Sequence, residues 1–375
     1  MKKYKVLHFP IANSRGGITN YALTNWEYIN KEMFQFDFAT LSKTLDFEEE
    51  LKAEGCKVHY LSCYAEDNKE KFIQEFSELL ENKYDIIHLH TTYWKSKLVE
   101  ECAIKKGVPR IIIHAHSTGI WNQPDERVRK DLLNIHNNVK NSLTIQDATD
   151  FWACSQFAAD WLYGKNINQE RIKILNNAIP IDKYIYSKKV RDNYRDLLGI
   201  GQDDFILGHV GRFAYEKNHE FLIEVFHQIQ KGIPNAKLLL IGLGPLKGLM
   251  IDKVNKLGLQ NKVIFLEKRN DVNNLLMVMD VFLLPSLFEG FSIVLLEAQI
   301  SGLKCISSDR VPSEVRLTEN IECLSLDREI WCKRIFSLSK GYDRRDMGKE
   351  ISEAGFDIKH QIKLIERLYM GDNII

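Results

Sequence analysis

The stretch VFLLPSLFEGFSIVLLE, residues 281–297, contains the repeating unit on which this chain is built. Val281–Leu284 is short and wholly apolar, which is typical of a strand buried on both faces. The turn Pro285–Phe288 follows, and an apolar helical segment starts directly after it. A buried strand that leads through a turn into a helix is the unit of a parallel α/β sheet.

The same alternation of short apolar runs and longer amphipathic segments fills both halves of the 375 residues. One clear helical segment is Lys69–Glu81, in which four apolar residues share a face: Phe72, Phe76, Leu79 and Leu80. The strands predicted in the first half are Lys5–Phe9, Phe34–Ala39, Lys57–Leu61, Asp85–Leu89, Arg110–Ala115 and Phe151–Cys154. Those predicted in the second half are Phe205–Val210, Lys237–Ile241, Lys262–Phe265, Val281–Leu284 and Lys304–Ser307.

A proline-containing stretch with little periodicity, Asn176–Ser187, separates the two series and is predicted to be a linker. We therefore predict an α/β fold of two Rossmann-like domains, residues 1–185 and residues 186–356, that face each other across a cleft. A C-terminal helix over residues 357–375 is expected to pack back on the first domain. Ligands of such sheets bind at the carboxyl ends of the strands.

The composition excludes several classes of protein. Lys and Arg number 51 and Asp and Glu number 51, and this balance holds within each half, so a nucleic-acid partner has no electrostatic support. No apolar run has the length of a signal peptide or of a membrane span. Seven scattered cysteines without a C-x-x-C pair favour reduced thiols. We expect a cytoplasmic protein.

The segment Glu289–Glu297 carries the strongest chemical signal. Backbone N–H groups at Phe291, Ser292 and Ile293 would be free at the start of the helix, where the helix dipole also favours an anion. Glu289 precedes the helix and Glu297 lies two turns inside it. Taken singly, these glutamates would be a helix cap and a surface residue. Together at a strand–turn–helix junction they predict a ligand site.

Two further segments follow predicted strands. In Gly211-Arg-Phe-Ala-Tyr-Glu-Lys-Asn218, Arg212 leaves a strand and Lys217 opens the next helix, so both are predicted to bind one phosphate group, although solvated charges are the alternative. Gly16 and Gly17 follow the first strand and would let the backbone approach a phosphate or a sugar, with a flexible turn as the alternative. Gly242-Leu-Gly-Pro245 is interpreted as structural.

These segments resemble the retaining glycosyltransferases of the two-domain GT-B fold, in the large family 4 that includes bacterial capsule and lipopolysaccharide enzymes. EGFSIVLLE at residues 289–297 matches the E-x7-E motif of that family, and GRFAYEKN at 211–218 matches its G-R-x5-K pattern in part. IGLGPL at 241–246 resembles the G-x-G-P turn, and FLEKRNDVNNLL at 265–276 resembles the base-binding loop. The resemblance covers nearly the whole chain. It departs at residues 177–182, NAIPID, where relatives often show N-G-I-D.

The resemblance implies roles for these residues. Arg212 and Lys217 would hold the donor diphosphate, Glu297 the donor ribose, and the backbone near Lys268 and Arg269 the base. Glu289 would act on the transferred sugar together with the segment that follows it, namely Gly290, Phe291, Ser292 and Ile293.

Paired histidines close two successive predicted strands, at His88-x-His90 and His114-x-His116. Alternation places the members of each pair on one side of the sheet, as ligands are presented in some metal hydrolases. This motivates a rival interpretation as a metal-dependent hydrolase. The simpler alternative is that His88 and His114 are hydrogen-bonded strand residues. The resemblance implies that His116 faces the reacting sugar and is catalytic, with His114 as a second candidate.

No D-x-D sequence occurs, so we expect a transferase that needs no metal or other cofactor, in which Arg212, Lys217 and the helix start neutralise the departing diphosphate. The resemblance implies a hexosyl- or N-acetylhexosaminyltransferase that retains configuration by front-face attack. Its donor would be a nucleotide-diphosphate sugar, with UDP favoured. Its acceptor would be a lipid-linked or oligosaccharide precursor of capsule, exopolysaccharide or O-antigen. A catalytically silent glycan-binding subunit is the non-enzyme alternative.

The acceptor is expected on the first domain. A helix over Trp94–Lys106 mixes apolar side chains with lysines, which suggests peripheral contact with the inner face of the plasma membrane. Glu100 and Glu101 weaken this interpretation, and an ordinary solvated helix is the alternative that we favour.

Overall fold

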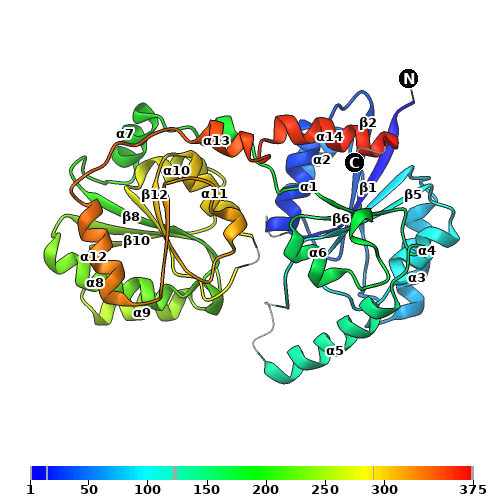
Figure 1. Ribbon diagram of the computed structural model, residues 1–375, viewed down its shortest axis with the longest axis horizontal. Coiled ribbons are helices and arrows are strands. Elements are labelled where there is room, and N and C mark those ends of the chain that lie inside the picture. The colour runs from blue at the N-terminus through cyan, green and yellow to red at the C-terminus, as the bar shows by residue number, and fades with distance from the viewer. Residues whose placement is uncertain (1, 14–15, 121–124, 290, 373–375) are drawn as a thin grey trace. The chain divides into compact units, whose positions relative to one another are not determined.

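The computed structural model describes residues 2–13, 16–120, 125–289 and 291–372. Contacts divide the chain into two compact units. Unit 1 comprises Met1–Ala178 and Ile358–Ile375, and unit 2 comprises Ile179–Asp357. Each unit is a parallel sheet with helices on both faces (Figure 1).

The sheet of unit 1 has seven strands in the order β3-β2-β1-β4-β5-β6-β7. The strands are β1 Tyr4–Ile11, β2 Phe34–Thr40, β3 Val58–Tyr60, β4 Ile86–Thr91, β5 Arg110–Ala115, β6 Asp150–Ala153 and β7 Ile172–Ile174. The helices are α1 Gly17–Tyr28, α2 Glu48–Ala53, α3 Lys69–Leu80, α4 Leu98–Lys105, α5 Glu126–Ser142, α6 Gln156–Leu162 and α14 Ile358–Met370, with the short 3-10 helix η1 Gln169–Arg171.

Both faces of this sheet are buried. Alternate residues of β1 and β4, such as Leu7 and Ile87, pack under α3, α4 and α6. Their neighbours Val6 and Ile86 pack under α1, α2 and α14 on the other face. The predicted helix 69–81 is confirmed, because α3 buries Phe72, Phe76, Leu79 and Leu80.

The sheet of unit 2 has six strands in the order β10-β9-β8-β11-β12-β13. The strands are β8 Phe205–Val210, β9 Ala236–Ile241, β10 Val263–Leu266, β11 Val281–Leu284, β12 Lys304–Ser308 and β13 Ile321–Leu324. The helices are α7 Lys188–Leu197, α8 His219–Gly232, α9 Lys247–Lys256, α10 Val272–Val278, α11 Ile293–Ile300, α12 Arg328–Leu338 and α13 Gly348–Glu353, with the 3-10 helices η2 Ile181–Lys183, η3 Tyr215–Lys217 and η4 Ser313–Val315.

Both sheets reverse their strand order once, between β1 and β4 in unit 1 and between β8 and β11 in unit 2. This is the order of a Rossmann fold, and its ligand-binding crevice lies where the order reverses, outside the carboxyl ends of the strands. The prediction of two Rossmann-like domains is confirmed. It missed only the edge strands β7 and β13, which are short and weakly apolar.

The boundary between the two units falls between residues 178 and 179, whereas the boundary predicted from the sequence falls between residues 185 and 186. The difference has a local cause, because the backbone N–H of Ile179 donates to the carbonyl of Phe356 at 2.9 Å. Ile179 and Ile181 also pack with Leu296 and Ile300 of α11. These contacts place the predicted linker from Ile179 onward in unit 2.

The helix expected over Trp94–Lys106 is shorter, because α4 begins at Leu98. Trp94 lies before it and is buried, and its indole N–H donates to the carbonyl of Leu162 at 2.8 Å. Leu98 is buried as well. Trp94 and Leu98 therefore belong to the core, and Ile104, at 46% exposure, is the one apolar side chain of this segment that is open to solvent, so α4 offers little apolar surface to a membrane.

Candidate functional site

Two loops of unit 2 leave the sheet where its strand order reverses. Gly211–Lys217 follow β8, and Pro285–Glu289 follow β11. The backbone N–H of Leu287 donates to the carbonyl of Glu216 at 2.8 Å, so the loops are joined directly. Asn218, at the start of α8, has the left-handed φ of 52°, which ends the η3 turn and begins the helix. The predicted phosphate-binding segment and the E-x7-E segment thus lie together.

Lys217 and Glu289 form the centre of this site. The Lys217 ammonium lies 2.5 Å from Glu289 Oε1, and the Ser286 hydroxyl donates to the same oxygen at 2.6 Å. The Lys217 and Glu289 side chains are 17% and 9% exposed, so water screens their ion pair only partly. Glu289 Oε2 has no hydrogen bond within the described part of the chain. The carboxylate is therefore held by one oxygen and open at the other.

The start of α11 presents free donors. Within the described residues the backbone N–H groups of Phe291, Ser292 and Ile293 have no acceptor, as is usual for the first turn of a helix. The Ser292 hydroxyl is buried and also has no partner there. Four polar groups without partners therefore lie beside Glu289. Gly290, which the sequence placed in the same site, lies outside the described residues.

Glu297 lies one turn after Ile293, the first residue of α11. Its carboxylate accepts a hydrogen bond from the Tyr184 hydroxyl at 2.7 Å. Burial raises the pKa of its carboxyl from 4.5 to about 7, and the Tyr184 hydrogen bond opposes the rise. Burial therefore favours the protonated form of the Glu297 carboxyl in the free protein.

The two predicted arginines differ in their surroundings. Arg212 is exposed and its side chain has no hydrogen bond or ion pair among the described residues, so its guanidinium is free to meet a ligand. Arg269 is engaged by Asp271, with contacts of 2.8 and 2.6 Å. Only the backbone near Arg269 was predicted to contact a ligand, and this ion pair fixes the loop that carries it.

The G-x-G-P turn at 242–245 is structural, as interpreted from the sequence. Gly242 and Gly244 have φ values of +146° and +157°. A Cβ on Gly242 would lie 2.1 Å from the carbonyl oxygen of Gly211, and one on Gly244 would lie 2.4 Å from that of Phe213. Only glycine lets the turn support the backbone on either side of Arg212.

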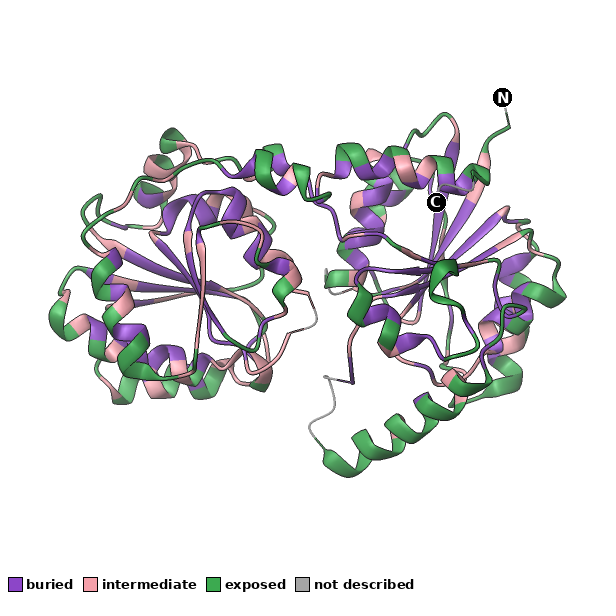
Figure 2. Cartoon of the chain, viewed as in Figure 1, coloured by how far each residue is buried: buried purple, intermediate pink, exposed green. Residues whose placement is uncertain are grey.

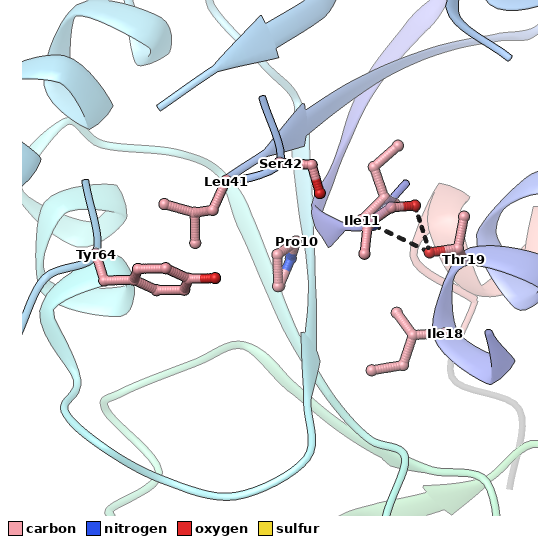
Figure 3. Close-up of a pocket in the computed structure, with 8 residues that line it drawn as sticks. Pro10, Ile11, Ile18, Thr19, Leu41, Ser42 and Tyr64 are labelled. Carbon is pink, nitrogen blue, oxygen red and sulfur yellow. Dashed lines mark hydrogen bonds between the residues drawn. The ribbon is translucent and has the colours of Figure 1, made fainter. Parts of the chain in front are cut away.

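In unit 1, Gly16 precedes α1 and Gly17 begins it, while Arg15 lies outside the described residues. Beside them is a hollow of about 190 Å³ at the carboxyl ends of β1 and β2. Its lining is mostly apolar, with three hydroxyl-bearing residues, and comprises Pro10, Ile11, Ala12, Ile18, Thr19, Leu41, Ser42 and Tyr64. Figure 3 shows the Tyr64 ring pointing toward Pro10 and the first turn of α1.

The paired histidines lie on one face of the sheet, and His8 of β1 lies beside them on the same face. His88 is hydrogen-bonded to Tyr369 of α14 at 2.7 Å and to His114 at 3.0 Å. His90 is hydrogen-bonded to His8 at 3.0 Å and to His116 at 2.9 Å. The interpretation of His88 and His114 as hydrogen-bonded strand residues is confirmed.

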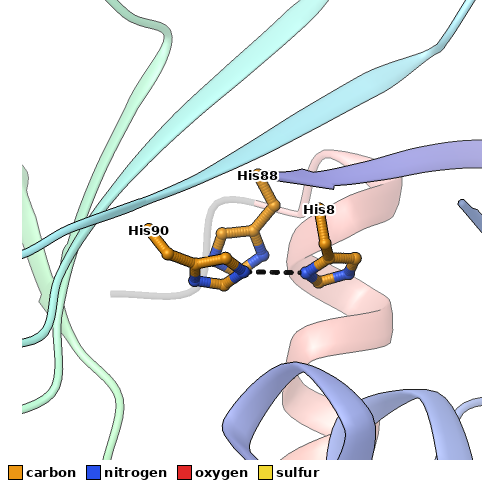
Figure 4. A group of neighbouring side chains, drawn as sticks. All are labelled: His8, His88 and His90. Carbon is orange, nitrogen blue, oxygen red and sulfur yellow. Dashed lines mark hydrogen bonds between the residues drawn. The ribbon is translucent and has the colours of Figure 1, made fainter. Parts of the chain in front are cut away.

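Two groups of these imidazoles are close enough to share a cation: His8, His88 and His90, and His90, His114 and His116 (Figure 4). The nitrogens of the bonded pairs lie 2.9–3.0 Å apart, which is hydrogen-bond distance. Two ligands of one tetrahedral zinc would lie about 3.3 Å apart, because each Zn–N bond is about 2.0–2.1 Å. Hydrogen bonding accounts for the cluster, and neither group includes a carboxylate.

Sequence reasoning missed Ser286, Tyr184 and His8. Ser286 could have been found from the sequence, because it is a hydroxyl-bearing residue in the predicted turn, three residues before Glu289. Tyr184 and Glu297 are 113 residues apart, and His8 and His90 are 82 apart, so only the fold pairs them.

Two family models match the chain. "Glycosyl transferase 4-like domain" matches residues 16–178, and "Glycosyl transferases group 1" matches residues 190–322. The structure of HepE from Anabaena, solved in complex with UDP and glucose, superposes with a TM-score of 0.76 over 99% of this chain and 100% of that one, at 17% identity. The chain is a glycosyltransferase with the two-domain GT-B fold.

Among similar proteins, the putative glycosyltransferase EpsF of Bacillus subtilis is 29% identical over 97% of this chain and 96% of its own length. The UDP-Gal:alpha-D-GlcNAc-diphosphoundecaprenol alpha-1,3-galactosyltransferase of Escherichia coli is 24% identical over 82% and 80%. The capsular polysaccharide biosynthesis glycosyltransferase CapH of Staphylococcus aureus is 23% identical over 99% of both. The transferase assignment takes the place of the hydrolase and silent-subunit interpretations.

Proposed function

We propose that this glycosyltransferase moves a hexosyl or N-acetylhexosaminyl group from a UDP-sugar to a lipid-linked or oligosaccharide acceptor, with retention of configuration and without a metal. The product would be a precursor of a cell-surface polysaccharide such as capsule, exopolysaccharide or O-antigen. The names of CapH and of the Escherichia coli galactosyltransferase support the pathway and the acceptor class. The UDP complex of HepE supports the nucleotide.

One observation carries the donor assignment, namely the cationic and N–H-rich site of unit 2. Lys217, the free Arg212 and the unpaired amides of residues 291–293 offer the charges and donors that a diphosphate needs. Lys217 and the three amides are set in place before the ligand arrives. They would therefore stabilise the charge that grows on the diphosphate as the sugar leaves.

Glu289 is proposed to act on the transferred sugar. Lys217 and Ser286 hold Oε1, so Oε2 keeps a defined direction and remains available to a sugar hydroxyl. As positive charge develops on the sugar ring, a fixed carboxylate beside it gains strength in the transition state. In front-face attack the acceptor oxygen bonds to the anomeric carbon on the face from which the diphosphate departs, and its proton passes to a diphosphate oxygen.

The hollow of unit 1 is proposed as part of the acceptor site. An aromatic ring, aliphatic side chains and the hydroxyls of Ser42 and Tyr64 suit the apolar face and the hydroxyls of one sugar ring. Gly16 and Gly17 bring backbone close to the same place. His116, at the end of β5, is proposed to face the bound substrate.

Peripheral membrane contact is proposed for α5. Among the described residues no helix is long and apolar enough to cross a bilayer. Figure 2 shows α5 exposed along almost its whole length, and only His136 is buried in it. Val128, Leu133 and Ile135 are 38–43% exposed. The basic residues Arg127, Arg129, Lys130 and Lys140 outnumber Glu126 and Asp131, which favours an anionic lipid surface.

Calorimetric titration with UDP tests the donor site. Arg212→Ala and Lys217→Ala should each weaken binding by about 1.5–3 kcal/mol, the usual contribution of a hydrogen bond to a charged group. Lys231→Ala, at an exposed position on α8, is the matched control and should bind normally. Unchanged affinity in both site variants would refute the assignment. A panel of nucleotide sugars, with the anomeric configuration of the product read by NMR, then tests the sugar and the stereochemistry.

A further inference from the structure

Three imidazoles form a continuous hydrogen-bonded chain in unit 1. His8 Nδ1 lies 3.0 Å from His90 Nε2, and His90 Nδ1 lies 2.9 Å from His116 Nε2. His8 and His90 are buried, and His116 at the carboxyl edge of the sheet is half-buried. Figure 4 shows His8 and His90 edge to edge across the neighbouring strands β1 and β4. The chain therefore runs from the core to the edge where ligands of such sheets bind.

All three rings are neutral. Burial lowers the pKa of His8 and of His116 to about 3, and the pKa of His90 lies well below its ordinary value of 6.5 for the same reason, with nearby imidazoles adding to the effect in His8 and His90. A neutral imidazole has one N–H and one bare nitrogen. In a chain of such rings each hydrogen bond fixes the next, so all the protons point toward His116 or all point away.

The buried end of the chain decides the direction. His8 Nε2 is buried and has no hydrogen-bond partner within the described residues. The Phe36 and Phe38 rings make angles of 42° and 29° with the imidazole plane, which departs from the near-perpendicular arrangement in which an imidazole N–H points at a ring face. A buried N–H without an acceptor is disfavoured more strongly than a bare nitrogen. The His8 proton therefore resides on Nδ1 and points to His90.

We propose that His8 and His90 are positioning residues that hold His116 as the Nδ1–H tautomer, so that it donates a hydrogen bond to a substrate oxygen and does not accept a proton. His90 Nδ1–H donates to His116 Nε2, which leaves the His116 proton on Nδ1. Among the described residues that nitrogen has no partner, and a bound oxygen would supply one. This inference rests on the proposed function for the substrate-facing place of His116.

The second chain on the same face supplies an internal control. It joins Tyr369, His88 and His114 and shares no hydrogen bond with the first chain. Tyr369→Phe removes the hydroxyl at one end of it. That variant perturbs the same packed face of the sheet without touching a hydrogen bond of His116.

Nitrogen NMR of the full-length protein with ¹⁵N-labelled histidine rings measures the tautomer directly, with no ligand present. His116→Gln assigns the signals. We expect wild-type His116 to show a protonated Nδ1 and a bare Nε2, equally at pH 6 and pH 8. His90→Asn should keep this pattern, because the amide N–H₂ can replace Nδ1–H as donor. His90→Leu should release it to a mixture of tautomers, and Tyr369→Phe should leave it unchanged.

Steady-state kinetics provides the second readout. His90→Leu should lower kcat roughly 10- to 100-fold, the scale for removing a partner that orients a histidine, and His90→Asn should restore most of the loss. A wild-type His116 with its proton on Nε2 would overturn the inference, even if His90→Leu fails to fold. So would identical His116 signals in the two His90 variants. The expected tautomer combined with full activity of His116→Gln would instead refute the substrate-facing role taken from the proposed function.

Discussion

The Glu297→Gln substitution tests the electrostatic state of the proposed donor site most directly. The Glu297 carboxyl is part-buried, accepts one hydrogen bond from Tyr184, and has its pKa raised from 4.5 to about 7. In the unfolded chain it ionises near its ordinary pKa. Between pH 4.5 and pH 7 the unfolded state therefore loses its proton first, so the stability of the folded state falls as the pH rises and levels off above pH 7.

The structure sets the size of the effect. A rise of about 2.5 pKa units corresponds to about 3.4 kcal/mol at about 1.36 kcal/mol per unit. Because part of the Glu297 side chain contacts water, which screens the charge, we expect about 1–2 kcal/mol. Glutamine fills the same space and cannot ionise. The variant should therefore be more stable than the wild type by this amount at pH 8 and equally stable at pH 4.5.

Scanning calorimetry at the two pH values is the assay. For a unit of this size, 1–2 kcal/mol corresponds to a rise in Tm of roughly 2–8 °C at pH 8. The control is Glu353→Gln in the same unit, where the carboxylate is 68% exposed, and it should shift Tm little at either pH. An equal shift for Glu297→Gln at both pH values, or a loss of stability at pH 8, would refute the reasoning. The same variant should raise the donor KM more than it lowers kcat, if Glu297 holds the ribose.

Four further outcomes follow from the proposed function. Glu289→Gln should lower kcat by roughly 10²–10³ with little change in donor KM, and a near-normal kcat would remove Glu289 from the sugar site. Turnover should persist in EDTA, and a complete loss that added metal restores would revive a metal-dependent mechanism. Tyr64→Ala should raise the KM for the acceptor and leave that for the donor unchanged, and the reverse pattern would place the hollow of unit 1 elsewhere in the reaction. Replacing Arg127, Arg129 and Lys130 of α5 together by glutamine should weaken binding to anionic vesicles, measured by co-sedimentation, by about 1 kcal/mol for each charge. The same replacement of Lys105 and Lys106 at the end of α4 should leave binding unchanged.

Much of the fold could be read from the sequence, because it rests on local periodicity. A strand buried on both faces must be wholly apolar over four to six residues, and an amphipathic helix must repeat its apolar positions every three or four. Val281–Leu284 and Lys69–Leu80 carry these patterns within their own residues. The parallel order of the strands follows, because each is reached through a helix. The glycosyltransferase assignment rested on motifs that are also local.

The apolar character of the segment at residues 94–106 was visible in the sequence, but whether its apolar side chains face the core or the solvent was not. Trp94 and Leu98 face the core of unit 1, whereas Ile104 of the same segment is exposed, as are Val128, Leu133 and Ile135 of α5. An apolar residue beside a charged one has the same appearance in a sequence whether it covers a sheet or faces solvent. Only the packing of neighbouring elements distinguishes the two.

The sequence by itself determined the two series of β-α units, the segments that meet where the strand order of unit 2 reverses, and the assignment of the chain as a glycosyltransferase. Only the tertiary structure decided how the polar groups are paired. Lys217 meets Glu289 across 72 residues, Tyr184 meets Glu297 across 113, and His8 meets His90 across 82. Such pairs depend on the register and spacing of strands that are remote in the chain. Hydrogen bonds act over about 3 Å, and no local pattern fixes positions to that precision across so many residues.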